Sequence, residues 1–292
     1  MLRTAFIVAA SCALAAQTPP GDAEENDARL ERMTTGLLHP AALAWLPAGI
    51  LLVAETPAGH LRSIGAQGMA KVHDGLYASG VAADAEGRVW IADSRKHRLL
   101  RIDRRGKTDV QVEGFEGKPF NGPGAVVVSR TGHVFVADPA WASGDESKAH
   151  PFYGVYLVSA RGQVSLAAKL TARPAGLAAS PDGKTLYASV ADTRSVLAWS
   201  IRDGELSNQR VFASGLDGVP AGLTAGPDGT VYVGARKNLL VFRPDGTQAS
   251  AIALPERATD CEVGEDGSTL FIATEASLFR WRVKASDGGK GH

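Results

Sequence analysis

One phrase recurs along this chain. The stretch RPAGLAASPDGKTLYAS, residues 173–189, returns as VPAGLTAGPDGTVYVG, residues 219–234. Aligned on the glycine that precedes an apolar run, the phrase occurs six times, at intervals of 38 to 51 residues. The six glycines are Gly49, Gly87, Gly132, Gly183, Gly229 and Gly267. A period of this length restricts the chain to folds that stack one supersecondary unit many times.

Each copy reads as an antiparallel sheet. Several of the glycines stand in Asp-Gly pairs, such as Asp182-Gly183 and Asp228-Gly229, between two apolar runs. Such a pair is a strong hairpin signal because the tight turn requires a positive φ. A strand of small residues precedes each turn, a β-branched and aromatic strand follows it, and a further apolar run comes next. The pattern predicts about four strands in each unit.

These units predict an all-β, six-bladed β-propeller over residues 29–284. One small sheet cannot bury both of its faces, whereas six sheets stacked around an axis can, and the ring leaves only short edges. The last repeat is short, and residues 28–38 belong to no repeat. We therefore expect this amino-terminal segment to supply the outer strand of the sixth blade and close the ring. A looser β-sandwich is the alternative.

The two ends of the chain read differently from the repeats. Residues 1–16 combine Arg3, a short apolar run and small residues near Ala15, which is the pattern of a secretory signal peptide. The apolar run is too short to cross a membrane, so we expect no transmembrane segment. Residues 17–28 are a predicted flexible lead-in and residues 285–292 a predicted disordered tail. The expected location is periplasmic or secreted, with a lipoprotein anchored through Cys12 as the alternative.

Composition excludes several classes of function. The chain has 31 basic and 31 acidic residues, which does not favour a nucleic acid partner. It has two cysteines, and one of them lies in the predicted signal peptide. A disulfide framework or a cysteine-based zinc site is therefore not expected. The nucleophile-elbow, phosphate-loop and zinc-protease motifs are absent from the sequence.

The repeats resemble a known family. The phrases NGPGAVVVSRTGHVFVADP, RPAGLAASPDGKTLY, VPAGLTAGPDGTVYV and ATDCEVGEDGSTLFIAT resemble, in this order, phrases of the gluconolactonase and regucalcin (senescence marker protein) family. The resemblance runs from about Leu38 to Arg282. The second unit, GVAADAEGRVWIADSRKHRLLRIDRRGK, also resembles an NHL-type propeller repeat. The resemblance implies a six-bladed propeller whose axial cavity holds one divalent metal, usually calcium, and hydrolyses lactones or related esters.

The positions that would hold the metal are altered here. The resemblance implies oxygen ligands from one Glu, two Asn and one Asp at the openings of four blades, as calcium requires. The aligned residues are Leu38, Gly124, Ala175 and Ala221, and none has a side-chain oxygen. We therefore expect no metal cofactor and a ligand-binding or calcium-independent protein, whose ligand in the axial cavity is a small molecule such as a lactone or sugar derivative. A lactone or ester hydrolase with a rebuilt site is the alternative.

Two residues are candidates for a rebuilt catalytic site. His39 adjoins the altered position Leu38, and its imidazole suits a general base. Asp260 opens the sixth blade beside Glu262 and offers a carboxylate across the ring closure. The alternatives are a polar residue at the cavity rim for His39 and a backbone cap at a strand start for Asp260.

Other candidates concern ligand binding. The longest insertion, residues 138–153, carries Trp141, His150, Phe152 and Tyr153, and long propeller loops commonly bind ligands. These residues are expected to form an aromatic lid over the cavity, or else a packed loop. Asn121 resembles an Asn that the family often keeps beside the cavity; it positions a ligand or holds its loop.

One run of the second unit is strongly basic. It comprises Arg95, Lys96, His97, Arg98, Arg101, Arg104, Arg105 and Lys107. The run reads as a solvated blade face because aromatic residues do not interleave with it. The alternative is a surface that binds a protein partner, as in NHL-type interaction propellers.

Overall fold

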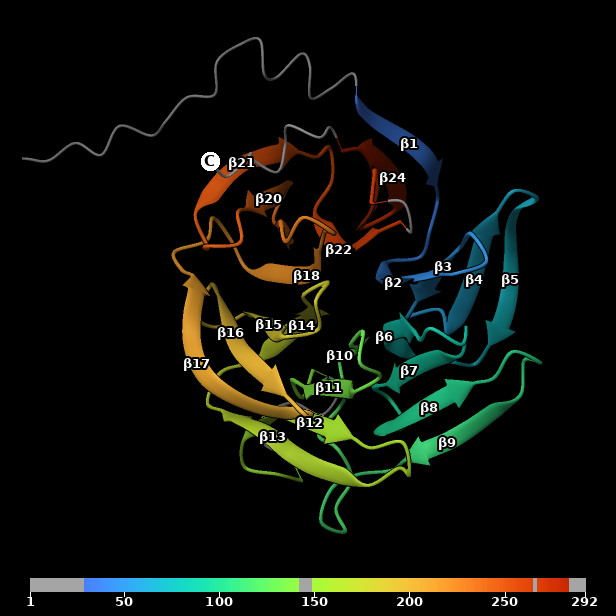
Figure 1. The fold of residues 1–292 in the computed structure, drawn as a ribbon. Helices are drawn as coiled ribbons and strands as arrows, with labels where there is room; N and C mark the ends of the chain where they lie inside the picture. Colours follow the sequence, from blue (N-terminus) through green and yellow to red (C-terminus); the bar gives the residue numbers. More distant parts are fainter. Residues whose placement is uncertain (1–28, 142–148, 265–266, 284–292) are drawn as a thin grey trace, which may run out of the picture.

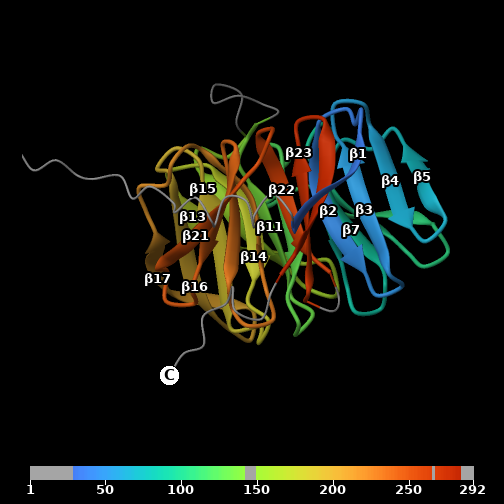
Figure 2. The ribbon, with the colours of Figure 1, turned by 90° about the horizontal axis from the view of Figure 1, so that it is seen from above.

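The predicted propeller is confirmed. The computed structural model describes residues 29–141, 149–264 and 267–283. Over these residues the chain forms six four-stranded antiparallel sheets, arranged as blades around one axis (Figure 1). Seen from the side, the blades form a thick disc (Figure 2). The predicted signal peptide, residues 1–16, the lead-in, residues 17–28, and the tail, residues 285–292, lie outside the described residues, as do residues 142–148 of the insertion.

The strands of each blade run outward from the axis in chain order, with one exception in the last blade. Blades 1 to 3 comprise β2 (Pro40–Leu46), β3 (Ile50–Glu55), β4 (His60–Gly65), β5 (Gly68–Asp74); β6 (Ala78–Ala83), β7 (Val89–Asp93), β8 (Arg98–Ile102), β9 (Thr108–Val112); and β10 (Ala125–Val128), β11 (Val134–Asp138), β12 (Tyr153–Val158), β13 (Val164–Leu170). Blades 4 to 6 comprise β14 (Pro174–Ala179), β15 (Thr185–Val190), β16 (Ser195–Arg202), β17 (Glu205–Ala213); β18 (Pro220–Ala225), β19 (Val231–Ala235), β20 (Asn238–Phe242), β21 (Gln248–Ala253); and β22 (Ala258–Val263), β23 (Thr269–Thr274), β24 (Ser277–Arg282) with β1 (Leu30–Thr35).

The repeated glycine has the conformation that the hairpin requires. All six turn glycines have a positive φ, between 66° and 83°. In each turn the glycine amide donates to the carbonyl three residues earlier, as from Gly183 to Ser180 at 2.8 Å. A residue with a Cβ would be strained at this position. The repeat therefore marks the hairpin that joins the innermost strand of each blade to the second.

The core lies between the blades. Among the described residues, six buried apolar clusters each fill the space between two neighbouring blades. The cluster between blades 5 and 6, for example, contains Leu239 and Ile272, both fully buried. Each blade thus contributes both faces to the core, which explains why one repeat alone could not fold.

The ring closes as the sequence predicted. Strand β1 pairs antiparallel with β24 and forms the outer edge of blade 6, so the first and last strands of the propeller lie side by side (Figure 1). The Arg280 guanidinium donates two hydrogen bonds to the Glu31 carboxylate, at 2.7 and 2.8 Å. Leu30 and Met33 pack against the clusters on the two sides of blade 6. Apolar packing, backbone pairing and this charged pair therefore join the first strand to the last one.

The described residues contain no helix that is long and apolar enough to cross a lipid bilayer.

Candidate functional site

A cavity of about 850 Å³ lies on the propeller axis. The innermost strands of all six blades, β2, β6, β10, β14, β18 and β22, contribute to its wall. Most of the wall consists of alanine, glycine, valine and leucine. The wall includes residues near both ends of these strands, such as Ala175 and Ala179 of β14. The cavity therefore extends along the axis for about the length of an inner strand.

The inner strands carry bulges that turn selected residues toward this cavity. In β14, Pro174 pairs with Val190 and Gly176 with Ser189, so Ala175 has no partner across the sheet. In β18 a longer irregularity, between Pro220 and Leu223, leaves Ala221 and Gly222 without partners in the register. A bulge re-aims the side chain of its extra residue, and bulges are frequent next to functional sites. Ala175 and Ala221 both line the cavity, as does Gly124 ahead of β10.

The wall at these positions does not fit a divalent cation. Glycine and alanine have no side-chain oxygen that could coordinate a cation. The bulge residues Ser79 and Thr259 have hydroxyl groups, but these donate hydrogen bonds to other protein groups. Ser79 donates to the Ser94 hydroxyl at 2.7 Å and Thr259 to the Pro40 carbonyl at 2.5 Å. Among the described residues, no group of three or more His, Cys, Asp or Glu side chains converges closely enough to hold a metal ion. Calcium requires six to eight oxygen ligands.

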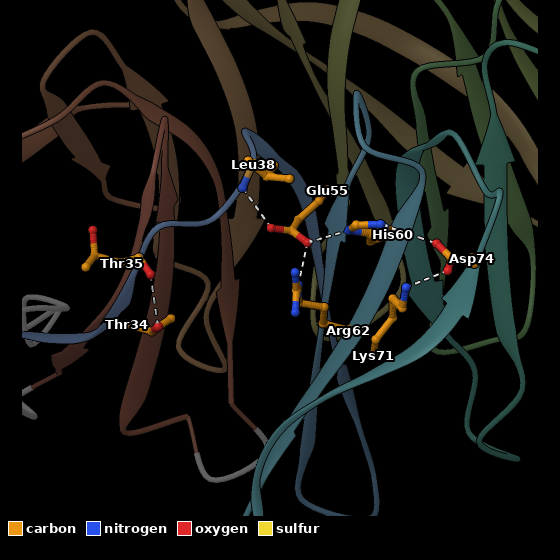
Figure 3. A network of polar contacts seen from close by, with 8 residues as sticks. All are labelled: Thr34, Thr35, Leu38, Glu55, His60, Arg62, Lys71 and Asp74. Carbon is orange, nitrogen blue, oxygen red and sulfur yellow. Dashed lines mark hydrogen bonds and ion pairs between the residues drawn. The ribbon is translucent and has the colours of Figure 1, made fainter.

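Leu38, the fourth altered position, does not line the cavity. It is half exposed, and its amide donates to the Glu55 carboxylate at 2.7 Å (Figure 3). Glu55 is fully buried and also binds Arg62 and His60. Burial alone would raise the pKa of Glu55, but the hydrogen bonds from Leu38 and Arg62 outweigh it and lower that pKa. This network fixes the segment that leads into β2.

Two carboxyl groups of β22 provide the acidic part of the cavity wall. Asp260 and Glu262 stand two residues apart, so both side chains face the same side of the strand. Asp260 Oδ2 accepts a hydrogen bond from the Leu43 amide of β2 at 2.7 Å. Glu262 Oε1 accepts one from the Trp45 amide at 3.4 Å, and its Oε2 accepts one from the Thr224 hydroxyl of β18 at 3.5 Å. The pair thereby links the inner strands of blades 5, 6 and 1.

Gly222 of β18 makes room for this arrangement. A Cβ at Gly222 would lie 1.7 Å from Asp260 Oδ1 and 2.8 Å from the Asp260 Cα. Any larger residue would therefore displace the Asp260 carboxyl from the Leu43 amide. The Pro-Ala-Gly phrase of blade 5 thus serves two purposes, because Ala221 faces the cavity and Gly222 allows blade 6 to approach.

Burial changes the acidity of both carboxyl groups. Both side chains are half-buried in the wall of the axial cavity, where protein replaces much of the surrounding water, so their charged forms are poorly hydrated. Burial raises the pKa of Asp260 to about 7, and the hydrogen bonds from backbone amides offset only part of this effect. Burial, together with the charge of Asp260, raises the pKa of Glu262 to about 8. Near neutral pH the pair therefore retains a proton and can donate a hydrogen bond.

His39 lies at the cavity mouth and Asp260 lies deeper. His39 immediately precedes β2, is exposed, and lines the cavity. The Asp260 carboxyl bonds to Leu43, four residues after His39, while its neighbour Thr259 bonds to Pro40, the residue next to His39. Among the described residues no hydrogen bond joins His39 to Asp260. Glu262 is the titratable group coupled to Asp260, since the charge of Asp260 contributes to the raised pKa of Glu262. The spacing of two residues between these acids on one strand is the sequence pattern that indicates the pair.

The structure separates the four predicted ligand-binding residues. Trp141 lines the cavity mouth and is 53% exposed. Asn121, His150 and Tyr153 are buried and are not among the lining residues. The Asn121 amide group donates to the carbonyls of His150 and Phe152 at 3.2 and 3.0 Å, and its oxygen accepts from the His150 amide at 2.9 Å. Asn121 thus holds the end of the insertion, and ligand binding by these three residues stays a prediction.

The basic run of blade 2 has several local partners. Arg98 pairs with Asp93 at 3.3 Å and Lys107 with Asp109 at 2.8 Å. The Arg95 guanidinium lies 4.4 Å from the centre of the Tyr77 ring. These contacts are those of a solvated blade face, and a protein partner here stays a prediction.

Comparisons with known proteins agree with this architecture. Residues 110–276 match the family described as "SMP-30/Gluconolactonase/LRE-like region", and residues 76–102 match the NHL repeat, which confirms the resemblance of blade 2. A gluconolactonase from Zymomonas mobilis subsp. mobilis is 30% identical over 258 residues, which cover 82% of this chain and 71% of that protein.

Two solved structures show the likeness in three dimensions. A gluconolactonase from Xanthomonas campestris superposes with a TM-score of 0.81 at 25% identity, over 87% of this chain and 89% of that one. A calcium-binding regucalcin from Agrobacterium tumefaciens superposes with a TM-score of 0.71 at 17% identity, over 85% and 90% of the two chains, which shows a shared fold. With the family match spanning more than half of its length, this chain belongs to the SMP-30/gluconolactonase/LRE-like family of six-bladed propellers.

Proposed function

We propose that this propeller binds a compact, mainly apolar small molecule in its axial cavity, without the metal ion that the family resemblance implies. The observation that carries the proposal is the cavity wall itself. Three of the four altered positions, Gly124, Ala175 and Ala221, line the cavity and replace oxygen donors with hydrogen or methyl groups. The space that metal-coordinating side chains would fill is thereby left open to a bound small molecule.

The size and chemistry of the cavity suit such a molecule. A volume of about 850 Å³ falls within the range of small-molecule sites, which is roughly 300–1,000 Å³. Such sites combine apolar walls with a few polar groups that orient the ligand. A protonated Glu262 or Asp260 donates a hydrogen bond, so it suits a carbonyl, ester or lactone oxygen. A lactone or a related neutral molecule is the ligand class that we favour.

Filling the cavity is expected to abolish binding. The probe is N-phenyl-1-naphthylamine, a neutral apolar fluorophore, titrated in the presence of EDTA. Ala175→Phe places a ring in the cavity and should weaken the binding of this probe at least ten-fold. The matched control is Ala253→Phe, on the exposed outer strand β21, which should leave the affinity unchanged. Circular dichroism checks that both variants are folded, and equal affinities for the two variants would refute the cavity as the site.

A second candidate function is lactone hydrolysis without a metal. It is favoured by one observation, the cavity-facing Asp260 with a pKa of about 7, because an efficient general base has a pKa near the operating pH. The related Zymomonas mobilis protein is named as a gluconolactonase. In this function Asp260 takes a proton from water as the water oxygen attacks the lactone carbonyl, and it returns that proton to the ring oxygen as the acyl C–O bond of the lactone breaks. Its signature is hydrolysis that persists in EDTA and is lost in Asp260→Asn.

A further inference from the structure

A second hollow, of about 770 Å³, adjoins the mouth of the axial cavity. The two spaces share three lining residues, Trp141, Val219 and Arg257, so a single ligand can reach both. The second hollow lies over the loops at one end of blades 4, 5 and 6. Its other lining residues are Ala191, Asp192, Arg194, Gly218 and Arg236.

Arginine side chains dominate this hollow. Arg194, Arg236 and Arg257 all line it and are exposed. Within the described part of the chain, Arg194 and Arg257 form no side-chain hydrogen bond or ion pair. Arg236 pairs with Asp217 at 3.0 Å, but both side chains are more than 60% exposed, so water and salt weaken the pair.

The one acidic residue in the lining does not offset these charges. The Asp192 carboxylate accepts hydrogen bonds from the amide and the guanidinium of Arg173, both at 2.8 Å. It is therefore already neutralised by a cation outside the lining. The guanidinium groups of Arg194 and Arg257 are left without carboxylate partners among the described residues, and guanidinium groups bind carboxylate, phosphate and sulfonate groups well.

The backbone at two of these arginines is strained. Arg194 and Arg236 have φ values of 46° and 52°, in the left-handed region that favours glycine. The corresponding turn of blade 1 has Gly59 immediately before β4, as Arg194 stands immediately before β16. At Gly218 a Cβ would lie 2.1 Å from Arg236 Cγ, so only a glycine lets the Arg236 side chain lie across this loop. His97 holds the same turn position in blade 2 with a φ of 55°, so this strain is a feature of the turn rather than of the hollow.

An apolar rim connects the charged hollow to the axial cavity. Trp141 and Val219, which line both spaces, are 53% and 47% exposed. Along β22 and the segment before it, Arg257 comes first, and Asp260 and Glu262 lie progressively deeper. A molecule entering here therefore meets guanidinium groups, then apolar side chains, and then the carboxyl pair.

We infer that the ligand is an amphiphilic anion. Its carboxylate, phosphate or sulfonate group binds Arg194, Arg236 and Arg257, and its apolar part passes Trp141 and Val219 into the axial cavity. This inference rests on the proposed function, because it takes the axial cavity as the site of the apolar part. Beyond the proposed function, the inference specifies the charge of the ligand and the end of the axial cavity through which the ligand enters.

The test compares two probes that differ by one group. 8-Anilinonaphthalene-1-sulfonate is N-phenyl-1-naphthylamine with a sulfonate added. We expect the protein to bind the sulfonate at least ten-fold more tightly than the neutral probe. Arg194→Gly with Arg236→Gly, at two positions that line only the second hollow, should remove most of this preference and leave the affinity for the neutral probe unchanged. Glycine relieves the strained backbone at both positions, so this variant is expected to fold.

Controls separate failure of this inference from failure of the proposed function. Arg202→Gln removes an exposed arginine at the end of β16, away from both spaces, and should preserve the sulfonate preference. Equal affinities for the two probes in the unmodified protein would overturn the anion site and leave the apolar cavity intact. Loss of the preference in Arg130→Gln, at the opposite end of the cavity, would also overturn it. Failure to bind the neutral probe at all would refute the proposed function itself.

Discussion

A chain that begins at Gly36 is expected to be less stable than a chain that begins at Arg29 by roughly 3–5 kcal/mol. The shorter chain lacks β1, the strand that completes blade 6. It loses the packing of Leu30 and Met33 and the paired hydrogen bonds between Arg280 and Glu31. The edge of β24 then faces solvent, and an unpaired edge strand favours association with another chain.

Urea unfolding followed by tryptophan fluorescence measures this difference. The chain from Arg29 is the matched control, since it keeps every residue that the structure describes at the amino-terminal end. Size-exclusion chromatography of the shorter chain should show dimers or larger species. Equal urea midpoints for the two chains would mean that β1 does not hold the ring closed.

The free energy of unfolding is expected to fall by about 2 kcal/mol between pH 7 and pH 9 because of Asp260 and Glu262. Burial raises the pKa of these groups to about 7 and about 8, from ordinary values of 3.8 and 4.5. The folded state therefore holds protons that the unfolded state has already released. The resulting stabilisation is complete below about pH 4, declines as the pH rises, and is lost once the pH passes 8.

The double variant Asp260→Asn with Glu262→Gln isolates this effect. Both amides keep an oxygen that accepts hydrogen bonds from the Leu43 and Trp45 amides, and neither titrates. Its unfolding free energy should change far less between pH 7 and pH 9, so that at pH 9 it is more stable than the unmodified protein. Glu205→Gln, an exposed carboxyl on β17, is the control and should follow the unmodified protein. A double variant with the same pH dependence as the unmodified protein would contradict the raised pKa values.

Most of the fold could be predicted because its signals are local and repeated. Each turn glycine, such as Gly183 or Gly229, needs a positive φ whatever surrounds it, and its period alone gives the number of blades. Even the ring closure could be predicted, because the last repeat was one strand short and residues 28–38 belonged to no repeat. The structure pairs these two parts as β24 and β1. Local patterns of this kind depend little on side-chain orientation.

The candidate site could be predicted only in part. The Pro-Ala-Gly phrases placed Ala175 and Ala221 on the cavity wall because they lie in register with the repeat. The partners of Asp260 and Glu262 could not be predicted, since Leu43 and Trp45 are 217 residues away in sequence and belong to another blade. Only the packing of inner strands around the axis brings these groups together.

The insertion shows the same limit. Its aromatic residues suggested a lid, but a loop without a periodic pattern does not reveal which way its side chains face. In the structure Asn121 fixes the backbone of His150, and the His150 ring lies 5.6 Å from that of Phe152 and 5.7 Å from that of Phe115. Trp141 alone of the four predicted lid residues lines the cavity.

The most direct test of the central claim is proton release from a panel of sugar and aliphatic lactones by the purified protein, measured once in EDTA and once in excess calcium. The absence of oxygen ligands at Gly124, Ala175 and Ala221 predicts the same rate in both conditions. If the protein is a hydrolase, that shared rate falls in Asp260→Asn; if it only binds its ligand, no lactone is turned over. Hydrolysis that appears only when calcium is added would contradict the account, because it would require a metal site that these residues cannot form.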